Sequence, residues 1–225
     1  MKRSQINALL REAEEMFAGI GFALPPWARW SPAEWADHPR AAAYCARRQM
    51  GWDVTDFGTG DFARRGLVLL CMRNGLVAND EERSYAEKLL VVREGQEAPY
   101  HFHRFKMEDI IVRGGGELIA QVFHTDENGA PLETEVEAQV DAEIVPVAAR
   151  ADLVLRHGQS ISLPPGVAHR LTAVPGRGTV VLGEVSRVND DFTDNVFFDE
   201  VSRFPPVEED APVLWPLWSE VAARI

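Results

Sequence analysis

One stretch near the middle of the chain decides the fold, and it reads Gly95-Gln-Glu-Ala-Pro-Tyr-His101-Phe-His103-Arg-Phe-Lys106-Met-Glu108. On a β-strand, side chains alternate between the two faces, so His101 and His103 point to the same side and can present two imidazoles to one metal ion. Glu108 follows a few residues later, which is far enough for the chain to turn and to bring a carboxylate back on the next strand. The stretch therefore predicts two neighbouring strands that share one edge of a metal site.

A second stretch supplies a further metal-binding side chain. It reads Gly158-Gln-Ser-Ile-Ser-Leu-Pro164-Pro-Gly166-Val-Ala-His169, in which two prolines and a glycine predict a tight turn just before the histidine. Three imidazoles and one carboxylate, from His101, His103, His169 and Glu108, leave a six-coordinate divalent ion with about two open positions, which is typical of a catalytic site. A His-x-His pair alone is equally compatible with a structural or surface role, so the prediction depends on both stretches together.

The two stretches resemble the two sequence motifs of the cupin superfamily. The first follows the pattern G-x5-H-x-H-x4-E-x6-G from Gly95 to Gly115, and the second follows G-x5-P-x-G-x2-H from Gly158 to His169. Ala173 replaces the usual asparagine four residues after the last histidine, which affects a turn and leaves the ligands unchanged. The resemblance implies an all-β jelly-roll barrel with the metal site inside it.

The rest of the chain predicts helical additions at both ends of this barrel. Residues 4–18 have the apolar periodicity of an amphipathic helix with Ser4 as its N-cap, and a second helix begins at Ser31 with a capping box to Glu34 and continues to about residue 48, with an interruption at His38-Pro39. From residue 51 the pattern changes to short strands between glycine and proline turns. We therefore expect an N-terminal helical layer over residues 1–50, the barrel over residues 51–204, and a C-terminal strap that ends in a short helix over residues 205–225.

Three segments of the barrel region carry more specific expectations. Residues 109–112 and 117–123 predict a hairpin about the three consecutive glycines at 114–116. Residues 132–150 are acidic with alternating valines, which predicts an excursion with solvated strands. Residues 186–195 are rich in hydrogen-bonding side chains, so they are either a recognition loop at the mouth of the barrel or a plain solvated loop.

Composition limits the partners and the compartment. The net charge of −12 argues against nucleic acid and favours a neutral small molecule over a phosphorylated one. Cys45 and Cys71 are the only cysteines, which indicates reduced thiols in a cytoplasmic protein. No apolar run approaches the roughly 20 residues of a membrane helix, and Arg11 and Glu12 fall where a signal peptide would be uncharged, so we expect no membrane partner and no export.

The site resembles that of one enzyme family in more detail. The run from His101 to Gly116, together with the later Gly183-Glu184-Val-Ser186-Arg187-Val-Asn189-Asp190-Asp191, is similar to the bacterial D-lyxose isomerase family over most of the chain. This resemblance implies a divalent ion, usually Mn²⁺ with Zn²⁺, Co²⁺ and Fe²⁺ as alternatives, and a homodimer. It also implies interconversion of free sugars, D-lyxose with D-xylulose and D-mannose with D-fructose. The family's metal ligands correspond to His101, His103, Glu108 and His169.

Aldose–ketose isomerisation requires a base that moves a proton between C1 and C2, and an acid or metal that stabilises the negative charge on the sugar oxygens. Lys106 is expected to donate to a sugar oxygen or to shuttle a proton, unless its side chain points to solvent. The family takes its catalytic carboxylate from the C-terminal part of the chain, where Glu200 is the first candidate because Phe197 and Phe198 precede it. Glu184 is the second candidate.

Hydroxyl recognition is the least specified part of the site. Glu184, Arg187 and Asp191 are candidates for contacts with the sugar hydroxyls. The sequence leaves open whether hydrogen moves as a proton through an enediol or as a hydride.

Three alternatives from other classes remain at this point. A cupin phosphosugar isomerase would need clustered arginines and lysines, which the chain lacks. A metal-dependent dioxygenase is compatible with the same ligands, because three histidines and a glutamate also bind Fe²⁺. A non-enzymatic sugar-binding module would bind sugar without turnover.

Overall fold

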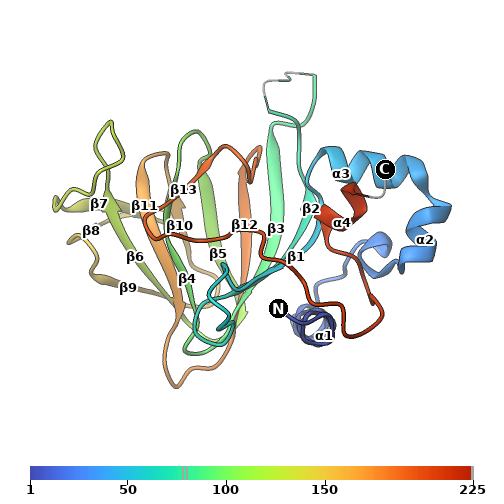
Figure 1. Cartoon of the computed structure of the whole chain (residues 1–225). Coiled ribbons are helices and arrows are strands. Elements are labelled where there is room, and N and C mark those ends of the chain that lie inside the picture. The colour runs from blue at the N-terminus through green and yellow to red at the C-terminus, as the bar shows by residue number, and fades with distance from the viewer. Residues whose placement is uncertain (78, 80, 224–225) are drawn as a thin grey trace.

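The computed structural model describes residues 1–77, 79 and 81–223 (Figure 1). The helices are α1 (Arg3–Gly19), η1 (Pro26–Arg29), α2 (Pro32–Asp37), α3 (Pro39–Arg47) and α4 (Trp218–Ala222). The strands are β1 (Gly51–Thr55), β2 (Leu67–Arg73), β3 (Tyr85–Val92), β4 (Glu97–His103), β5 (Glu108–Gly115), β6 (Leu118–His124), β7 (Val136–Val140), β8 (Glu143–Val147), β9 (Asp152–Leu155), β10 (Ser160–Leu163), β11 (Val167–Ala173), β12 (Val180–Arg187) and β13 (Asn195–Phe197).

The strands form two antiparallel sheets, which confirms the expected all-β fold. One sheet has eight strands in the order β1-β2-β3-β12-β5-β10-β7-β8, and the other has five in the order β13-β4-β11-β6-β9. The helices gather at the β1 end of the eight-stranded sheet (Figure 1). The acidic excursion of residues 132–150 contains β7 and β8, which extend the opposite end of the same sheet.

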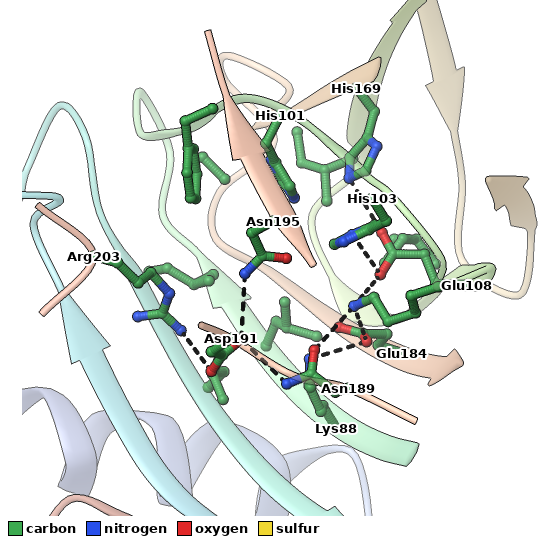
Figure 2. A pocket seen from close by; sticks show the side chains of 18 of the residues that line it. Lys88, His101, His103, Glu108, His169, Glu184, Asn189, Asp191, Asn195 and Arg203 are labelled. Carbon is green, nitrogen blue, oxygen red and sulfur yellow. Dashed lines mark hydrogen bonds and ion pairs between the residues drawn. The ribbon is translucent and has the colours of Figure 1, made fainter. Parts of the chain in front are cut away.

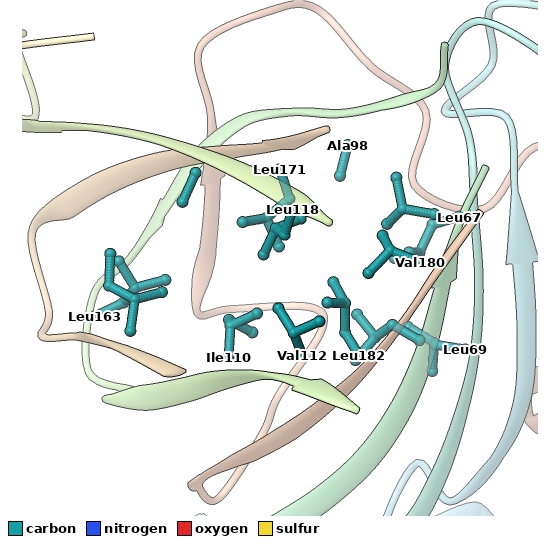
Figure 3. Packing of buried hydrophobic residues seen from close by; sticks show 14 of the residues in the cluster. Leu67, Leu69, Ala98, Ile110, Val112, Leu118, Leu163, Leu171, Val180 and Leu182 are labelled. Atoms are coloured by element: carbon teal, nitrogen blue, oxygen red, sulfur yellow. The ribbon is translucent and has the colours of Figure 1, made fainter. Parts of the chain in front are cut away.

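The main core lies between the two sheets. Leucine, isoleucine and valine side chains from the facing strands fill it, among them Leu69, Ile110 and Leu182 of the eight-stranded sheet and Leu118 and Leu171 of the five-stranded sheet (Figure 3). Full burial of one such side chain contributes about 1.5–3 kcal/mol relative to its exposure to water. This core supports the inner face of the strands that carry the site.

A second core explains why residues 67–72 of β2 and residues 89–92 of β3 are apolar without interruption. Helix α1 packs Leu10 and Phe17 against the outer face of β1 and β2, where Trp52 and Leu70 are buried. The rings of Phe17 and Trp52 stack with centroids 6.1 Å apart. Because both faces of these strands are covered, their sequences lack the alternation of a half-exposed strand.

The expected N-terminal helices are confirmed, with one correction at their ends. Ser31 accepts a hydrogen bond from the Glu34 backbone N–H, and the Glu34 carboxylate accepts one from the Ser31 backbone N–H, which is the expected capping box. Helices α2 and α3 are separate elements that meet at His38. The N-cap of α1 is Lys2 and not Ser4, because the Ser4 hydroxyl donates to Asp210 instead.

The expected hairpin about the glycines at 114–116 is wrong. Strand β5 belongs to the eight-stranded sheet and β6 to the five-stranded sheet, so the glycines carry the chain from one sheet to the other. Gly115 has φ of 74°, and a Cβ atom there would lie 2.3 Å from the Thr179 carbonyl oxygen. Glycine is required because it allows this close approach and the left-handed backbone.

The C-terminal segment, residues 198–223, is tied to the start of the chain. The Arg3 side chain is fully buried, donates to the Glu209 carboxylate at 2.7 Å and 2.9 Å, and also contacts Glu220. The Arg3 backbone N–H donates to Glu208 O at 2.8 Å. Helix α4 then contacts α3. Across the described part of the chain, every helix is too short or too polar to cross a lipid bilayer.

Candidate active site

Two strands of the five-stranded sheet bring three histidines together. His101 and His103 lie on β4, and His169 lies on β11, where it pairs directly with His101 in the antiparallel register. One ring nitrogen of each histidine lies within 4.8 Å of the corresponding nitrogen of the other two. The two distant sequence stretches therefore meet at one point inside the molecule.

The Nδ1 atom of each of these histidines lies next to an oxygen atom, which fixes the orientation of the ring. Nδ1 of His101 donates to Pro99 O at 2.9 Å, and Nδ1 of His169 donates to Val167 O at 3.3 Å. Nδ1 of His103 lies 3.1 Å from Asp194 Oδ2. Burial lowers the pKa of His101 well below its ordinary value, so its imidazole is neutral and can use Nε2 as a ligand.

Glu108, the first residue of β5, faces the histidines. Its Oε1 atom lies 3.1 Å from Nε2 of His169, and its Oε2 atom lies 3.3 Å from Nε2 of His103. Within the described residues these two Nε2 atoms are buried without a hydrogen-bond partner. The Nε2 atoms of the histidines and the carboxylate oxygens of Glu108 converge on one place, and imidazole nitrogens with a carboxylate are a donor set that divalent first-row ions take. The side chains therefore fit a divalent metal ion.

Lys106 points inward and joins the carboxylates of this site. Its Nζ atom lies 2.7 Å from Oε2 of Glu108, and it donates to Glu184 Oε1 at 2.9 Å and to Asn189 Oδ1 at 3.3 Å. Burial lowers the pKa of Lys106, but Glu108 and Glu184 outweigh it and raise the pKa above the ordinary value. The lysine is therefore an ammonium that donates hydrogen bonds, and the alternative of a solvent-facing side chain is wrong.

Glu184, on β12, is held through one of its two oxygens. Oε1 accepts from Lys106 Nζ and from Ser186 Oγ at 3.0 Å, and it lies 3.1 Å from Lys88 Nζ. Burial raises the pKa of Glu184, but Lys106 and Lys88 lower it below its ordinary value, so the carboxylate is ionised. Among the described side chains, no hydrogen bond reaches Oε2. That oxygen is available to a substrate.

A second polar group lies across the cavity from the histidines. Oδ1 of Asp191 accepts from Asn189 Nδ2 at 3.1 Å and from Asn195 Nδ2 at 3.3 Å, while Oδ2 accepts from Arg203 at 3.4 Å (Figure 2). Arg203 also donates to Asp53 Oδ2 at 2.5 Å. The remaining walls are apolar and consist of Phe57, Leu67, Leu69, Leu90, Ala98, Ile110, Leu171 and Phe197. Such walls exclude water and strengthen electrostatic interactions inside the cavity.

The structure brings most of the predicted site residues to this cavity. Those that line it are His101, His103, Lys106, Glu108, His169, Glu184 and Asp191. Glu200 and Arg187 do not line it, and both are exposed. On β12, Glu184 and Ser186 face inward, so Arg187 faces outward by alternation and lines a separate surface pocket. Glu200 follows β13 in the C-terminal segment.

Four polar cavity residues are absent from the sequence-based candidates: Lys88, Asn189, Asn195 and Arg203. Lys88 has a local signal, because it alternates in phase with Leu90 and Val92, which are core residues on the inner face of β3. A lysine in such a position is buried, and a buried lysine requires a partner. The positions of Asn189, Asn195 and Arg203 in the cavity depend on pairings between distant segments, which no local pattern indicates.

Comparison with known proteins decides the family. A model of the D-lyxose isomerase family matches residues 1–221. The chain belongs to the D-lyxose isomerase family. This family member is 42% identical over 222 residues to a D-lyxose/D-mannose isomerase of Serratia proteamaculans, covering 98% of the chain and 97% of that protein. It is 40% identical to a D-lyxose/D-mannose isomerase of Escherichia coli O157:H7, with 98% of each chain covered.

Solved structures support the fold of this family member. The L-ribose isomerase of Cellulomonas parahominis with L-ribose matches with a TM-score of 0.63 at 17% identity. The match covers 92% of this chain and 98% of the chain of that enzyme. The L-ribose isomerase of Acinetobacter sp. DL28 with L-ribose has the same TM-score at 14% identity, with the same coverage. The chain therefore has the fold of these structures, which is the cupin fold. The family model and the curated relatives support an isomerase of free sugars, and the dioxygenase and phosphosugar isomerase alternatives are not favoured.

Proposed function

We propose that the chain interconverts D-lyxose with D-xylulose and D-mannose with D-fructose. The observation that supports this proposal is the continuous polar path from the three histidines through Glu108 and Lys106 to Glu184. It places a cation site, a hydrogen-bond donor and a free carboxylate oxygen in one cavity. Curated relatives that are about 40% identical are named D-lyxose/D-mannose isomerases.

The metal site of the proposal consists of His101, His103, Glu108 and His169. Mn²⁺ is the first choice, and Zn²⁺, Co²⁺ and Fe²⁺ also suit imidazole and carboxylate ligands. When bound, such an ion acts as a Lewis acid that polarises a carbonyl and stabilises negative charge on sugar oxygens. The convergence of both Glu108 oxygens and the Nε2 atoms of His103 and His169 supports this assignment.

Glu184 is the proposed base, in place of the exposed Glu200. Oε2 of Glu184 removes the proton from C2 of the aldose and returns it to C1, so the C2–H bond breaks and a C1–H bond forms through an enediol. One hydroxyl proton passes from O2 to O1, and no external oxidant or reductant is required. Lys106 donates to the sugar oxygen on which charge develops.

The test of the function is a panel of free aldoses and ketoses offered to the manganese-loaded protein, with elemental analysis of the bound ion. D-Lyxose should be converted to D-xylulose, chelation should abolish the conversion, and added Mn²⁺ should restore it. D-Lyxose deuterated at C2 should lose part of its label to water if Glu184 transfers a proton, because the proton on the carboxyl group can exchange before it reaches C1, whereas a hydride shift would retain the whole label on C1. No conversion of any free aldose would contradict the proposal.

The homodimer and the cytoplasmic location also belong to this proposal. Val77 and Phe105 are 59% and 68% exposed and line one surface pocket, which is consistent with a covering subunit. Cys45 and Cys71 are buried free thiols, which suits a reducing compartment. Light scattering of the purified protein tests the dimer, since a monomer mass would exclude it.

A further inference from the structure

Strand β13 brings an additional polar side chain beside the histidines. In its antiparallel pairing with β4, Asn195 lies opposite His103, and Phe197 lies opposite His101. Directly paired residues of an antiparallel pair point to the same face, so Asn195 and Phe197 share the face of the two histidines. The Phe197 and His101 rings are 5.2 Å apart, whereas Val196 between them packs against a different cluster that contains Phe102.

The orientation of the Asn195 amide is determined by its neighbour Asp191. Burial raises the pKa of Asp191, but Arg203 and Lys88 lower it below its ordinary value, so the side chain is a carboxylate that only accepts hydrogen bonds. The amide must therefore turn its N–H₂ group toward Asp191, and Nδ2 lies 3.3 Å from Oδ1 of that residue. In Figure 2 the Asn195 oxygen faces toward His103 and away from Asp191.

Asp191 is itself held from two other directions. Asn189 Nδ2 donates to the same oxygen at 3.1 Å, and Arg203 donates to the second oxygen at 3.4 Å. Arg203 is fixed in turn by Asp53 on β1. Rotation of the Asp191 carboxylate would break these contacts, so the amide of Asn195 is also held in one orientation. Within the described chain, Oδ1 of Asn195 accepts no hydrogen bond.

A sugar hydroxyl is the natural donor for this oxygen. We propose that Asn195 Oδ1 accepts a hydrogen bond from a hydroxyl of the open-chain sugar beyond its C1–C2 pair, and that Asn195 thereby selects among aldoses. This inference rests on the proposed sugar isomerase function. An analogue without that hydroxyl leaves the amide oxygen unpaired in the cavity, which weakens its binding relative to the parent sugar.

The test combines substrate analogues with variants of Asn195. The parent sugar is D-lyxose, and the analogues are its 3-deoxy, 4-deoxy and 5-deoxy forms. For the native protein, kcat/KM should fall roughly 10-fold or more for the analogue that lacks the contacted hydroxyl. In Asn195→Ala, kcat/KM for D-lyxose should fall to the value that the native protein has for that analogue. Within this variant, the ratio of kcat/KM for D-lyxose to kcat/KM for the analogue should therefore approach one, and the metal content should stay unchanged. Val196→Ala, on the opposite face of the same strand, should keep the native ratios.

The outcomes separate this inference from the proposed function. If the native protein isomerises D-lyxose but Asn195→Ala keeps the native ratio for every deoxy analogue, the hydroxyl contact is wrong and the isomerase assignment stands. If the native protein converts no free aldose, the proposed function fails first. Asn195→Leu fills a similar volume without an acceptor, and it takes the place of the alanine variant if that variant loses metal or fails to fold.

Discussion

The Nζ atom of Lys106 lies 2.9 Å from Oε1 of Glu184. The same ammonium lies 2.7 Å from the Glu108 carboxylate, which faces the histidines. The Lys106 ammonium therefore connects the carboxylate of the proposed metal site with the carboxylate proposed as the base. It compensates two buried negative charges and leaves the second oxygen of Glu184 free.

Glu184→Gln should lower kcat by about 10²–10⁴-fold, because an amide cannot accept the C2 proton. The metal content should stay unchanged, since Glu184 faces Lys106 and Lys88 and not the histidines. Turnover and elemental analysis of the purified variant check both statements. The matched variant is Glu200→Gln, which alters an exposed carboxylate and should retain native turnover. Native turnover in Glu184→Gln together with lost turnover in Glu200→Gln would identify Glu200 as the base.

His103→Ala should remove the bound metal and the turnover together, because one of three converging imidazoles is lost and Glu108 remains buried beside the gap. Metal content per chain is the direct measurement. His157→Ala is the control, since the His157 ring is exposed and lies 2.7 Å from the Arg113 carbonyl oxygen, away from the three-histidine cluster. A His103→Ala protein with full metal occupancy would contradict the proposed ligand set.

Lys88→Met should lower kcat roughly 10- to 100-fold with a smaller change in KM and no loss of metal. The Lys88 ammonium lies 3.1 Å from Glu184 Oε1 and donates to Asn189 at 2.8 Å, so its removal allows the proposed base to move. Ser186→Ala removes a neutral donor from the same oxygen and should cost less than about tenfold. Native kcat in the methionine variant would show that Lys106 alone positions the base.

Arg3→Met should lower the free energy of unfolding by about 2 kcal/mol, because Glu209 and Glu220 lose a charged hydrogen-bond donor. Urea unfolding measures the change. Lys2→Met is the neighbouring control, since Lys2 and Glu208 are 59% and 67% exposed, and it should change stability by less than about 0.5 kcal/mol. Equal effects of the two variants would mean that the buried pairing adds nothing.

Local chemistry made part of this molecule predictable. The spacing of His101 and His103 indicates a shared strand face because side-chain alternation depends only on neighbouring residues. The capping box at Ser31 is equally local, and it begins a helix where expected. The fold class and the convergence of the histidines are therefore readable from short motifs.

Long-range pairing made the rest unpredictable. Glu184 and Arg187 are close in sequence, yet only the packing of β12 between β3 and β5 determines which of them faces the cavity. The two phenylalanines before Glu200 favour it as the base in the sequence, but the path of the C-terminal segment leaves its side chain exposed. Asn195 reaches the cavity only through the register of β13 against β4. These relationships join segments far apart in the chain.

The position of Arg203 has a consequence for biosynthesis. Arg203 helps to form the cavity wall, and the segment that carries it follows every other residue that lines the cavity. During translation, the two sheets can collapse around their leucine and valine core while this segment is still inside the ribosome. A nascent chain should therefore bring its histidines, Glu108 and Glu184 together before its cavity is closed, and a shortened translation product that ends before Arg203 should lack both this part of the cavity wall and the partners of the buried Arg3.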